Sequence, residues 1–326
     1  MKKIEIKPFR DFWQDCFNCI VYSVIDYTQD VDRLFFYNNR YTYVTTNETT
    51  DNTKKTYKSI TAWTDNISFL ETVGKNRKET NYHDPDELLA YVKQQIDAEN
   101  IVLMSIDLFH WIDEGLHYQT NHVVHFSMAI GYDDEKRELI VLETGNDMYA
   151  EFRVPYERVI LASNAGNNLI YTYEINRDVK LTMFNKQELS EQAGPIIASI
   201  QEKLDNEDEI LQIDDFEEDD LTEVLDIIQT HMFSMQNRCK INAHMFENAF
   251  LNDSVEGTTM HDEFTKIAVD FEKMKGACIM AKCRNDKVGA IKKIKQRIFE
   301  NLKKEQDLWN LYIEHKDAFE MKEFDN

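Results

Sequence analysis

The feature that most limits the possible folds is a change of residue pattern near residue 185. Before it, segments rich in β-branched and aromatic residues alternate with amphipathic segments of helical spacing. After it the strand pattern stops, and long segments with helical spacing follow. The sequence therefore predicts an α+β protein, with a mixed strand and helix domain over residues 1–182 and an α-helical bundle domain over residues 183–326.

Composition agrees with two folded domains. The chain has 326 residues, 42% of them hydrophobic, and only nine glycines and four prolines. It can therefore bury a sizeable core, and a mainly disordered chain is not indicated. The acidic run NEDEILQIDDFEEDDLTE stands near residues 205–220. Because like charges repel one another, we expect a solvated loop or linker there.

The charge balance and the cysteines bear on partners and compartment. The formal net charge is −23, which argues against nonspecific binding to nucleic acid, since such binding needs clustered basic residues. The first residues, MKKIEIKPFRDF, lack the apolar core of a signal peptide, and we find no uncharged apolar window long enough to span a membrane. The five cysteines are unevenly spread, which favours reduced thiols. We expect a cytoplasmic protein without membrane or nucleic-acid partners.

Two neighbouring segments predict a β-hairpin of core strands. VVHFSMAIGYDD and RELIVLETGN are apolar runs that meet at the turn-forming DDEK. The segment NIVLMSIDLF before them predicts another buried strand. Further upstream, Asp84 and Pro85 predict the start of an amphipathic helix.

Cys16 is the candidate nucleophile. It stands directly before the apolar helical run FNCIVYSVIDY, and a helix start lowers the pKa of a thiol there. His125 begins one strand of the predicted hairpin and Glu143 ends the other, so the two would lie near one end of it. We therefore expect His125 to act as the base and Glu143 to orient its imidazole.

Other interpretations of the cysteines remain open. In the simplest interpretation, Cys16 is an ordinary buried thiol. Cys19 lies one turn further along the helix, and we expect it to pack in the core. A zinc site at Cys16-x-x-Cys19 would need a second ligand pair, and Cys278 and Cys283 are too widely spaced for a zinc knuckle. A thioredoxin-type redox pair would need a preceding strand. We therefore predict no metal site.

Several residues near the hairpin are candidates for secondary roles. Asp107 ends a buried strand and is either a partner that supports the catalytic residues or a turn cap. His122 is a second candidate base, in the loop before the His125 strand. Tyr118, Asn121 and Trp111 are candidates to line a substrate cleft, whereas His110 and His117, which flank Trp111, are expected to lie at the surface or in a pocket wall.

The order of a cysteine at a helix start, a histidine on a strand and a polar residue ending the next strand is that of papain-like cysteine enzymes. HFSMAIGYDD resembles the histidine strand of the double-glycine peptidases that process bacteriocins. IVLMSIDLFHW and the short N-terminus with its cysteine resemble the butirosin-biosynthesis acyltransferase family, over roughly residues 5–175.

This resemblance implies a papain-like cysteine domain with Cys16, His125 and Glu143 at the nucleophile, base and orienting positions. It also implies acyltransferase activity in the biosynthesis of antibiotics or other peptide or polyketide natural products. An acyl group would pass from the phosphopantetheine thioester of an acyl or peptidyl carrier protein to Cys16, and then to an amine on a small molecule or peptide. No bound cofactor is implied.

The chain departs from the family pattern at three places. Phe17 follows the cysteine, where the family has a small residue, and Glu143-Thr144 replaces an Asp-Pro pair. Arg10 occupies the position of the glutamine that supports the oxyanion in papain-like enzymes. The backbone N–H of Cys16 is therefore the first candidate oxyanion donor, and the side chain of Gln14 is the second.

Two other functions remain open. A cysteine peptidase or amide hydrolase would use the same residues with water as the acceptor, and a non-catalytic binding or scaffold protein would keep only the fold. The basic segment KVGAIKKIKQRIFENLKKEQ would suit an acidic carrier protein, although a solvated helix face is the commoner interpretation. The long amphipathic segments would also suit a homodimer.

Overall fold

The chain forms two compact units. The computed structural model describes residues 1–10, 16–28, 39–64, 70–71, 73–82, 84–115, 117–145, 148–178, 185–284 and 286–322. The first unit, called here the α/β unit, comprises Met1–Val31 and Asn66–Thr182. The second, called the helical unit, comprises Asp32–Asp65 and Met183–Asn326.

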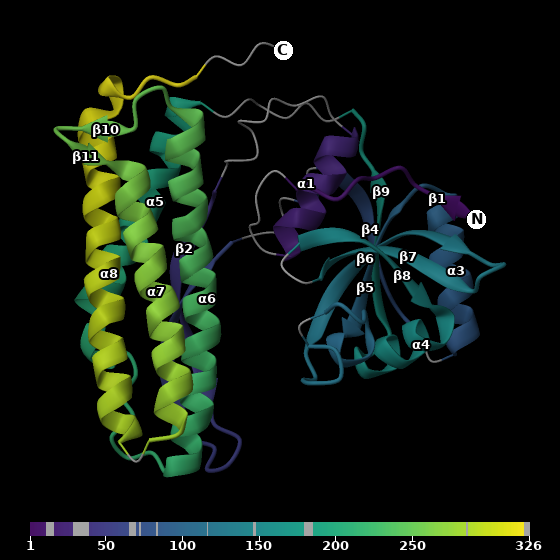
Figure 1. The fold of residues 1–326 in the computed structure, drawn as a ribbon, viewed down its shortest axis with the longest axis horizontal. Coiled ribbons are helices and arrows are strands. Elements are labelled where there is room, and N and C mark those ends of the chain that lie inside the picture. The colour runs from purple at the N-terminus through teal and green to yellow at the C-terminus, as the bar shows by residue number, and fades with distance from the viewer. Residues whose placement is uncertain are drawn as a thin grey trace. The chain divides into compact units, whose positions relative to one another are not determined.

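An antiparallel sheet forms the centre of the α/β unit (Figure 1). Every residue of its strand β5 is buried, so the predicted buried strand is confirmed. The described residues give the sheet seven strands, β1 pairing with β6 and the others running in the order β4 (Gly74–Asn81), β9 (Leu169–Ile175), β5 (Ile101–Asp107), β6 (Val124–Asp133), β7 (Glu138–Gly145) and β8 (Met148–Pro155), with β1 at Lys2–Lys3.

The predicted hairpin is confirmed as β6 and β7, which pair antiparallel with Met128 opposite Leu142. Its turn is held by Asp133, whose Oδ1 accepts hydrogen bonds from the backbone N–H groups of Glu135 and Lys136. An aspartate that accepts from the backbone two and three residues on is a common turn former. The DDEK segment therefore closes the hairpin through its first residue.

Helices pack against this sheet. Helix α3 (Pro85–Asp97) begins as predicted, because Asp84 accepts from the backbone N–H groups of Asp86 and Glu87. Helix α1 (Cys16–Thr28) packs against β7, and its residues 18–25 are all buried. Helix α4 (Tyr156–Ala165) packs against β5 and the short 3-10 helix η2 (Leu108–His110).

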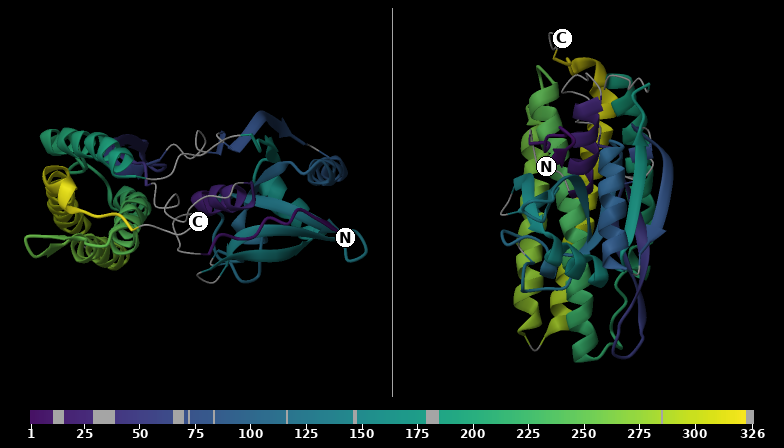
Figure 2. Two further views of the ribbon diagram at one scale, coloured as in Figure 1. Left: turned by 90° about the horizontal axis from the view of Figure 1, so that it is seen from above. Right: turned by 90° about the vertical axis from the view of Figure 1, so that its right-hand side faces the viewer.

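Long helices make up most of the helical unit (Figures 1 and 2). Their apolar faces share one core with a β-hairpin from the N-terminal half. The coarse α+β class, with helices in the C-terminal part of the chain, is thereby confirmed. The helices are α5 (Lys186–Asp205), η3 (Glu207–Glu209), α6 (Glu218–Ala249), α7 (Met260–Lys282), α8 (Lys287–His315) and η4 (Lys316–Ala318), and the short pair β10 (Ser254–Val255) and β11 (Thr258–Thr259) joins α6 to α7.

The predicted domain over residues 1–182 needs one correction. The hairpin of β2 (Thr42–Thr49) and β3 (Thr56–Trp63) belongs to the helical unit, where β2 packs against α5 and β3 against α6. The physical reason is that buried tyrosines in and next to β2 donate hydrogen bonds to a carboxylate on a helix of this unit. Tyr41 and Tyr43 are buried there, and both hydroxyls donate hydrogen bonds to Glu305 on α8.

Glu305 is the centre of a buried polar network in the helical unit. Its side chain is 0% exposed, and its Oε2 accepts from the hydroxyl of Tyr43 at 2.6 Å and from the Cys239 thiol at 3.5 Å. The hydroxyl of Tyr41 in turn accepts from Asn242 and Trp309. Burial raises the pKa of Glu305, although the surrounding donors act against the shift.

The acidic run near residues 205–220 differs from the expected linker. It joins α5 to α6 within one unit, and Ile210, Leu211 and Ile213 are buried in the core while the acids on either side of them, at 207–209 and 214–215, are exposed. The backbone N–H of Leu211 also donates to the carbonyl of Lys58 on β3. The apolar residues therefore fix this segment to the helices, which charge alone did not indicate.

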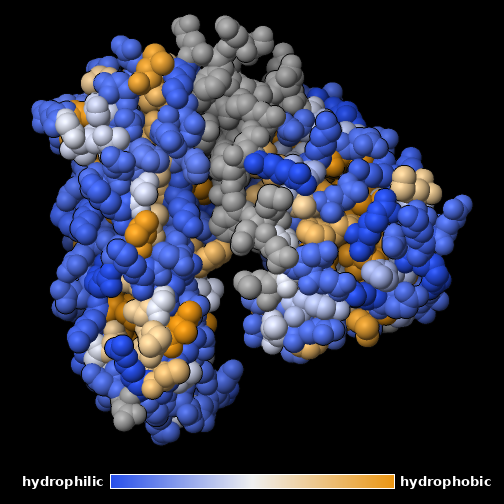
Figure 3. Space-filling model, in the orientation of Figure 1, coloured by the Kyte–Doolittle hydropathy of each residue, from blue (hydrophilic) through white to orange (hydrophobic). Residues whose placement is uncertain are grey.

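The surface is mainly hydrophilic on the face that Figure 3 shows, with small apolar patches. Four of the larger exposed apolar residues, each more than 40% exposed, lie on α6 and α7: Phe233, Val269, Ile279 and Met280. In the described part of the chain, no helix combines the length and apolar character that crossing a membrane requires.

Gly131 on β6 generates a first test. A Cβ at this position would lie 2.7 Å from the carbonyl oxygen of Lys2, because β1 pairs closely beside it. We expect Gly131→Ala to weaken the pairing of β1 with β6 and to speed amide hydrogen exchange at Ile4, which donates to Ile130. In the matched control Gly194→Ala, an exposed helical position with no atom near the new Cβ, stability should rise by about 0.5–1 kcal/mol. Unchanged exchange at Ile4 would contradict this account.

Glu305 generates a second test, through pH. Folding raises the pKa of Glu305, so its protonated form adds to the free energy of unfolding. This stabilisation is fully present below the ordinary glutamate pKa and is lost as the pH rises through the raised value. Glu305→Gln removes this titration. As the pH rises above the ordinary glutamate pKa of about 4.3, the free energy of unfolding of the variant should therefore fall less than that of the wild type. Urea unfolding followed by circular dichroism measures both, and parallel pH profiles would contradict the raised pKa.

Candidate functional site

His125 and Glu143 lie together at one end of the β6–β7 hairpin. The Nε2 atom of His125 is 3.5 Å from Oε1 of Glu143, with the imidazole 23% exposed and the carboxylate 2% exposed. This distance suits an ion pair but exceeds that of a strong hydrogen bond. Catalytic contacts are often this long before a substrate binds.

Among the described residues, hydrogen bonds hold the carboxylate of Glu143 through one of its two oxygens. Its Oε1 accepts from the backbone N–H of Thr144 at 2.8 Å, a donor that a proline at position 144 would lack. Its Oε2 is buried and has no hydrogen-bond partner among the described residues. A buried carboxylate oxygen without a donor costs free energy, so this site favours a cationic or N–H-bearing neighbour.

Cys16 is the first residue of α1, as predicted, and the helix that it starts packs against the strand of Glu143. The side chain of Cys16 and the whole of Gln14 lie outside the described residues, so their roles stay predictions. Cys19 is 0% exposed among apolar neighbours, in agreement with core packing. Cys278 is also buried, which raises the pKa of its thiol to about 12.

Asp107 ends β5 and caps the short helix η2. Its Oδ1 accepts from the backbone N–H groups of Phe109 and Val123, at 3.0 and 3.1 Å, and its Oδ2 accepts from Nδ1 of His122 at 2.6 Å. Burial disfavours the charged carboxylate, but these hydrogen bonds, that of His122 first, outweigh it and lower the pKa of Asp107. The turn-cap interpretation of Asp107 therefore agrees with its contacts.

The Asp107–His122 pair and the His125–Glu143 pair use opposite faces of the sheet. His125 is opposite Ile106 in the ladder, whereas Asp107 is opposite Val124. Because side chains alternate along a strand, neighbouring residues such as His125 and Val124 point to opposite faces. His122 is therefore not placed to replace His125 as the partner of Glu143.

The three candidate cleft residues have different surroundings. Asn121 is exposed, and Tyr118 is half-buried with the guanidinium of Arg158 5.0 Å from its ring centre. Trp111 needs a correction: its side chain is 0% exposed and its indole N–H donates to Ser127, so it belongs to the core of the α/β unit. Tyr118 does line a groove of about 640 Å³ with Phe109, His110, Gln119, Pro155, Glu157, Arg158 and Leu161.

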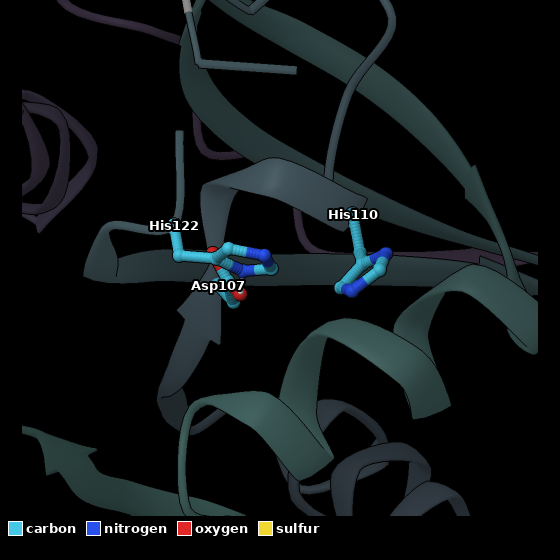
Figure 4. Close-up of side chains that lie close together, drawn as sticks. All are labelled: Asp107, His110 and His122. Atoms are coloured by element: carbon cyan, nitrogen blue, oxygen red, sulfur yellow. Dashed lines mark hydrogen bonds and ion pairs between the residues drawn. The ribbon is translucent and has the colours of Figure 1, made fainter. Parts of the chain in front are cut away.

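The sequence predicts only a surface or pocket-wall position for His110, but its side chain lies beside the Asp107–His122 pair. Figure 4 shows the imidazole rings of His110 and His122 next to the carboxylate of Asp107. One ligand atom from each residue lies within 4.8 Å of the other two. The spacing Asp-x-x-His is compatible with such a cluster, but His122 joins it only through strand pairing, which local patterns do not reveal.

Comparison with known proteins adds no assignment. No protein-family model matches the chain, and no curated protein matches it significantly. The geometry of the described residues therefore carries the functional argument.

Removing the Asp107 carboxylate tests its structural role. Asp107→Ala leaves the N–H groups of Phe109 and Val123 without their acceptor, so we expect a loss of about 1–3 kcal/mol of stability. Amide hydrogen exchange should speed up at these two positions. Asp107→Asn keeps a side-chain oxygen and should retain most of their protection. Equal protection of both amides in Asp107→Ala would contradict the capping role.

Proposed function

We propose that the chain is a cysteine-dependent acyltransferase with a papain-like α/β unit, in which Cys16 is the nucleophile, His125 the base and Glu143 the orienting acid. The observation that carries this proposal is the approach of His125 Nε2 to Glu143 Oε1, 3.5 Å apart, in a sheet against which the helix of Cys16 packs. A histidine next to a buried carboxylate is the arrangement that nucleophilic catalysis by a thiol needs.

The orientation of the imidazole supports the assignment. Since Nε2 faces Glu143, Nδ1 is the nitrogen that would take the thiol proton. The imidazolium formed in that step would then donate its Nε2–H to Glu143. The buried carboxylate, whose Oε2 has no hydrogen-bond partner in the described part of the chain, would gain a cationic neighbour at that stage. The pair is therefore better matched to the charged intermediate than to the resting state.

The reaction has two transfers. His125 takes the proton of Cys16, and the thiolate attacks the acyl carbon of a thioester on the phosphopantetheine arm of a carrier protein. The carbon–sulfur bond to pantetheine breaks, the pantetheine thiolate takes the proton from His125, and an acyl-Cys16 remains. An amine then attacks the acyl carbon, gives its proton to His125, and releases Cys16.

Two features favour a thioester as the acyl donor. Exchange of a thioester for acyl-Cys16 is nearly isoenergetic, so it demands little activation of the leaving group. The start of α1 would also stabilise the Cys16 thiolate through the helix dipole. The backbone N–H of Cys16 is the proposed oxyanion donor, with Gln14 as the second candidate.

Intact-protein mass spectrometry tests the proposal. The full chain is mixed with an acyl carrier protein or a short acyl thioester, and we expect a mass gain of one acyl group. Cys16→Ala should abolish the gain, and the matched control Cys19→Ala should retain it if it folds, as shown by circular dichroism. His125→Ala should slow acylation by about 10²–10⁴-fold, and Glu143→Gln should slow it less.

The other outcomes separate the rival functions. An acyl-enzyme that decays at the same rate with and without amines would indicate a hydrolase. No adduct over a panel of thioesters, together with slow alkylation of Cys16 by iodoacetamide at neutral pH, would indicate a binding or scaffold protein.

A further inference from the structure

The cluster at the end of β5 contains three metal-ligating side chains outside the proposed catalytic residues. They are Asp107, His110 and His122, and one ligand atom of each lies within 4.8 Å of the others. Ligand atoms bound to one tetrahedral zinc ion lie about 3.3 Å apart, at zinc–nitrogen and zinc–oxygen distances of roughly 2.0–2.2 Å. Small rotations of the half-buried His110 and the exposed His122 would therefore bring the three side chains into a common coordination sphere.

The carboxylate of Asp107 is already positioned for this role. Backbone N–H groups of Phe109 and Val123 hold its Oδ1, so Oδ2 is the atom that points toward the histidines. Such hydrogen bonds to a ligating carboxylate fix its direction and strengthen metal binding. Oδ2 accepts a hydrogen bond from Nδ1 of His122, at 2.6 Å.

Both imidazoles are also held in place. The ring of His122 stacks on Phe109, with 4.2 Å between ring centres and 16° between planes. His110 packs edge-on against the same phenylalanine, with 4.9 Å between ring centres. One phenylalanine thus orients both histidines, and the cost of ordering two ligands on metal binding is reduced.

The cluster is open to solvent on the histidine side. The side chain of His122 is 69% exposed while that of Asp107 is 4% exposed, so a cation can reach the buried carboxylate past the ring. His110 also lines the groove of about 640 Å³ that contains Tyr118 and Arg158. A ligand bound to an open coordination position would have room in this groove.

We propose that Asp107, His110 and His122 form a Zn²⁺ site in the α/β unit. The ion would replace the proton on Nδ1 of His122: an imidazolium releases that proton to solvent, and a neutral ring carries it on Nε2 instead. The third bond would come from His110. Three protein ligands leave a position for water or a ligand atom, as in catalytic rather than structural zinc sites. Two imidazoles select zinc over calcium or magnesium, which prefer oxygen ligands.

This site is independent of the proposed acyl transfer. Its carboxylate ligand Asp107 points to the face of the ladder opposite to that of His125, and the site needs no contribution from Cys16. Loss of acyl transfer in one set of variants and loss of metal binding in another are therefore separate results.

Metal titration of the full chain, free of any histidine tag, tests the proposal. We expect one equivalent of Zn²⁺ by isothermal titration, and with Co²⁺ the visible absorption of a site with nitrogen and oxygen ligands. His110→Ala and His122→Ala should each weaken binding by on the order of 10-fold or more, and Asp107→Asn by about 10–100-fold. Circular dichroism in the presence of a chelator shows whether each variant is folded.

A second histidine pair supplies the matched control. His244 and His261 both lie near Glu247 in the helical unit, at 3.9 and 3.8 Å, so they are the alternative surface site. His244→Ala should leave zinc affinity unchanged. Loss of the bound equivalent in His244→Ala but not in folded His122→Ala would overturn the proposal, as would millimolar or weaker affinity of the wild-type chain.

Discussion

The register between β5, β6 and β7 determines the chemistry of the α/β unit. Pairing of His125 with Ile106 and of Val124 with Asp107 sends two histidine–carboxylate pairs to opposite faces of one sheet. If β6 slipped by one residue against its neighbours, each of its side chains would move to the other face of the sheet. Val124, now 57% exposed, would then take the place of His125. The turn at Asp133 and the full burial of β5 prevent such a slip. One set of ladder hydrogen bonds therefore fixes both candidate sites.

The helical unit depends on a different kind of constraint. Its hairpin is joined to the helices by hydroxyl groups that converge on one buried carboxylate, Glu305. Such a network contributes little net stability compared with apolar packing, but it tolerates few alternative arrangements, because each misplaced donor would leave a buried polar group unsatisfied. The network thus selects one position of β2 and β3 on the helix bundle.

Local patterns predicted the elements whose signals lie within the element itself. The β6–β7 hairpin, the Asp84 cap and the helix that starts at Cys16 are of this kind. Strand β4 was missed because its sequence GKNRKETN has no apolar alternation: it is an edge strand whose charged residues discourage further pairing. The position of β2–β3 and the cluster of Asp107 with two histidines depend on contacts between distant segments, which no local pattern encodes.

The separation along the chain between Tyr41 and Glu305 has a consequence for biosynthesis. The two residues are 264 positions apart, and at ribosomal rates of 5–20 residues per second they are made roughly 13–53 s apart. During that interval the hydroxyls of Tyr41 and Tyr43 lack their acceptor Glu305, although α5 and α6, which pack against β2 and β3, are made earlier. The hairpin can therefore pack on α5 and α6 first, and its tyrosine hydroxyls gain their buried acceptor only when α8 has been made.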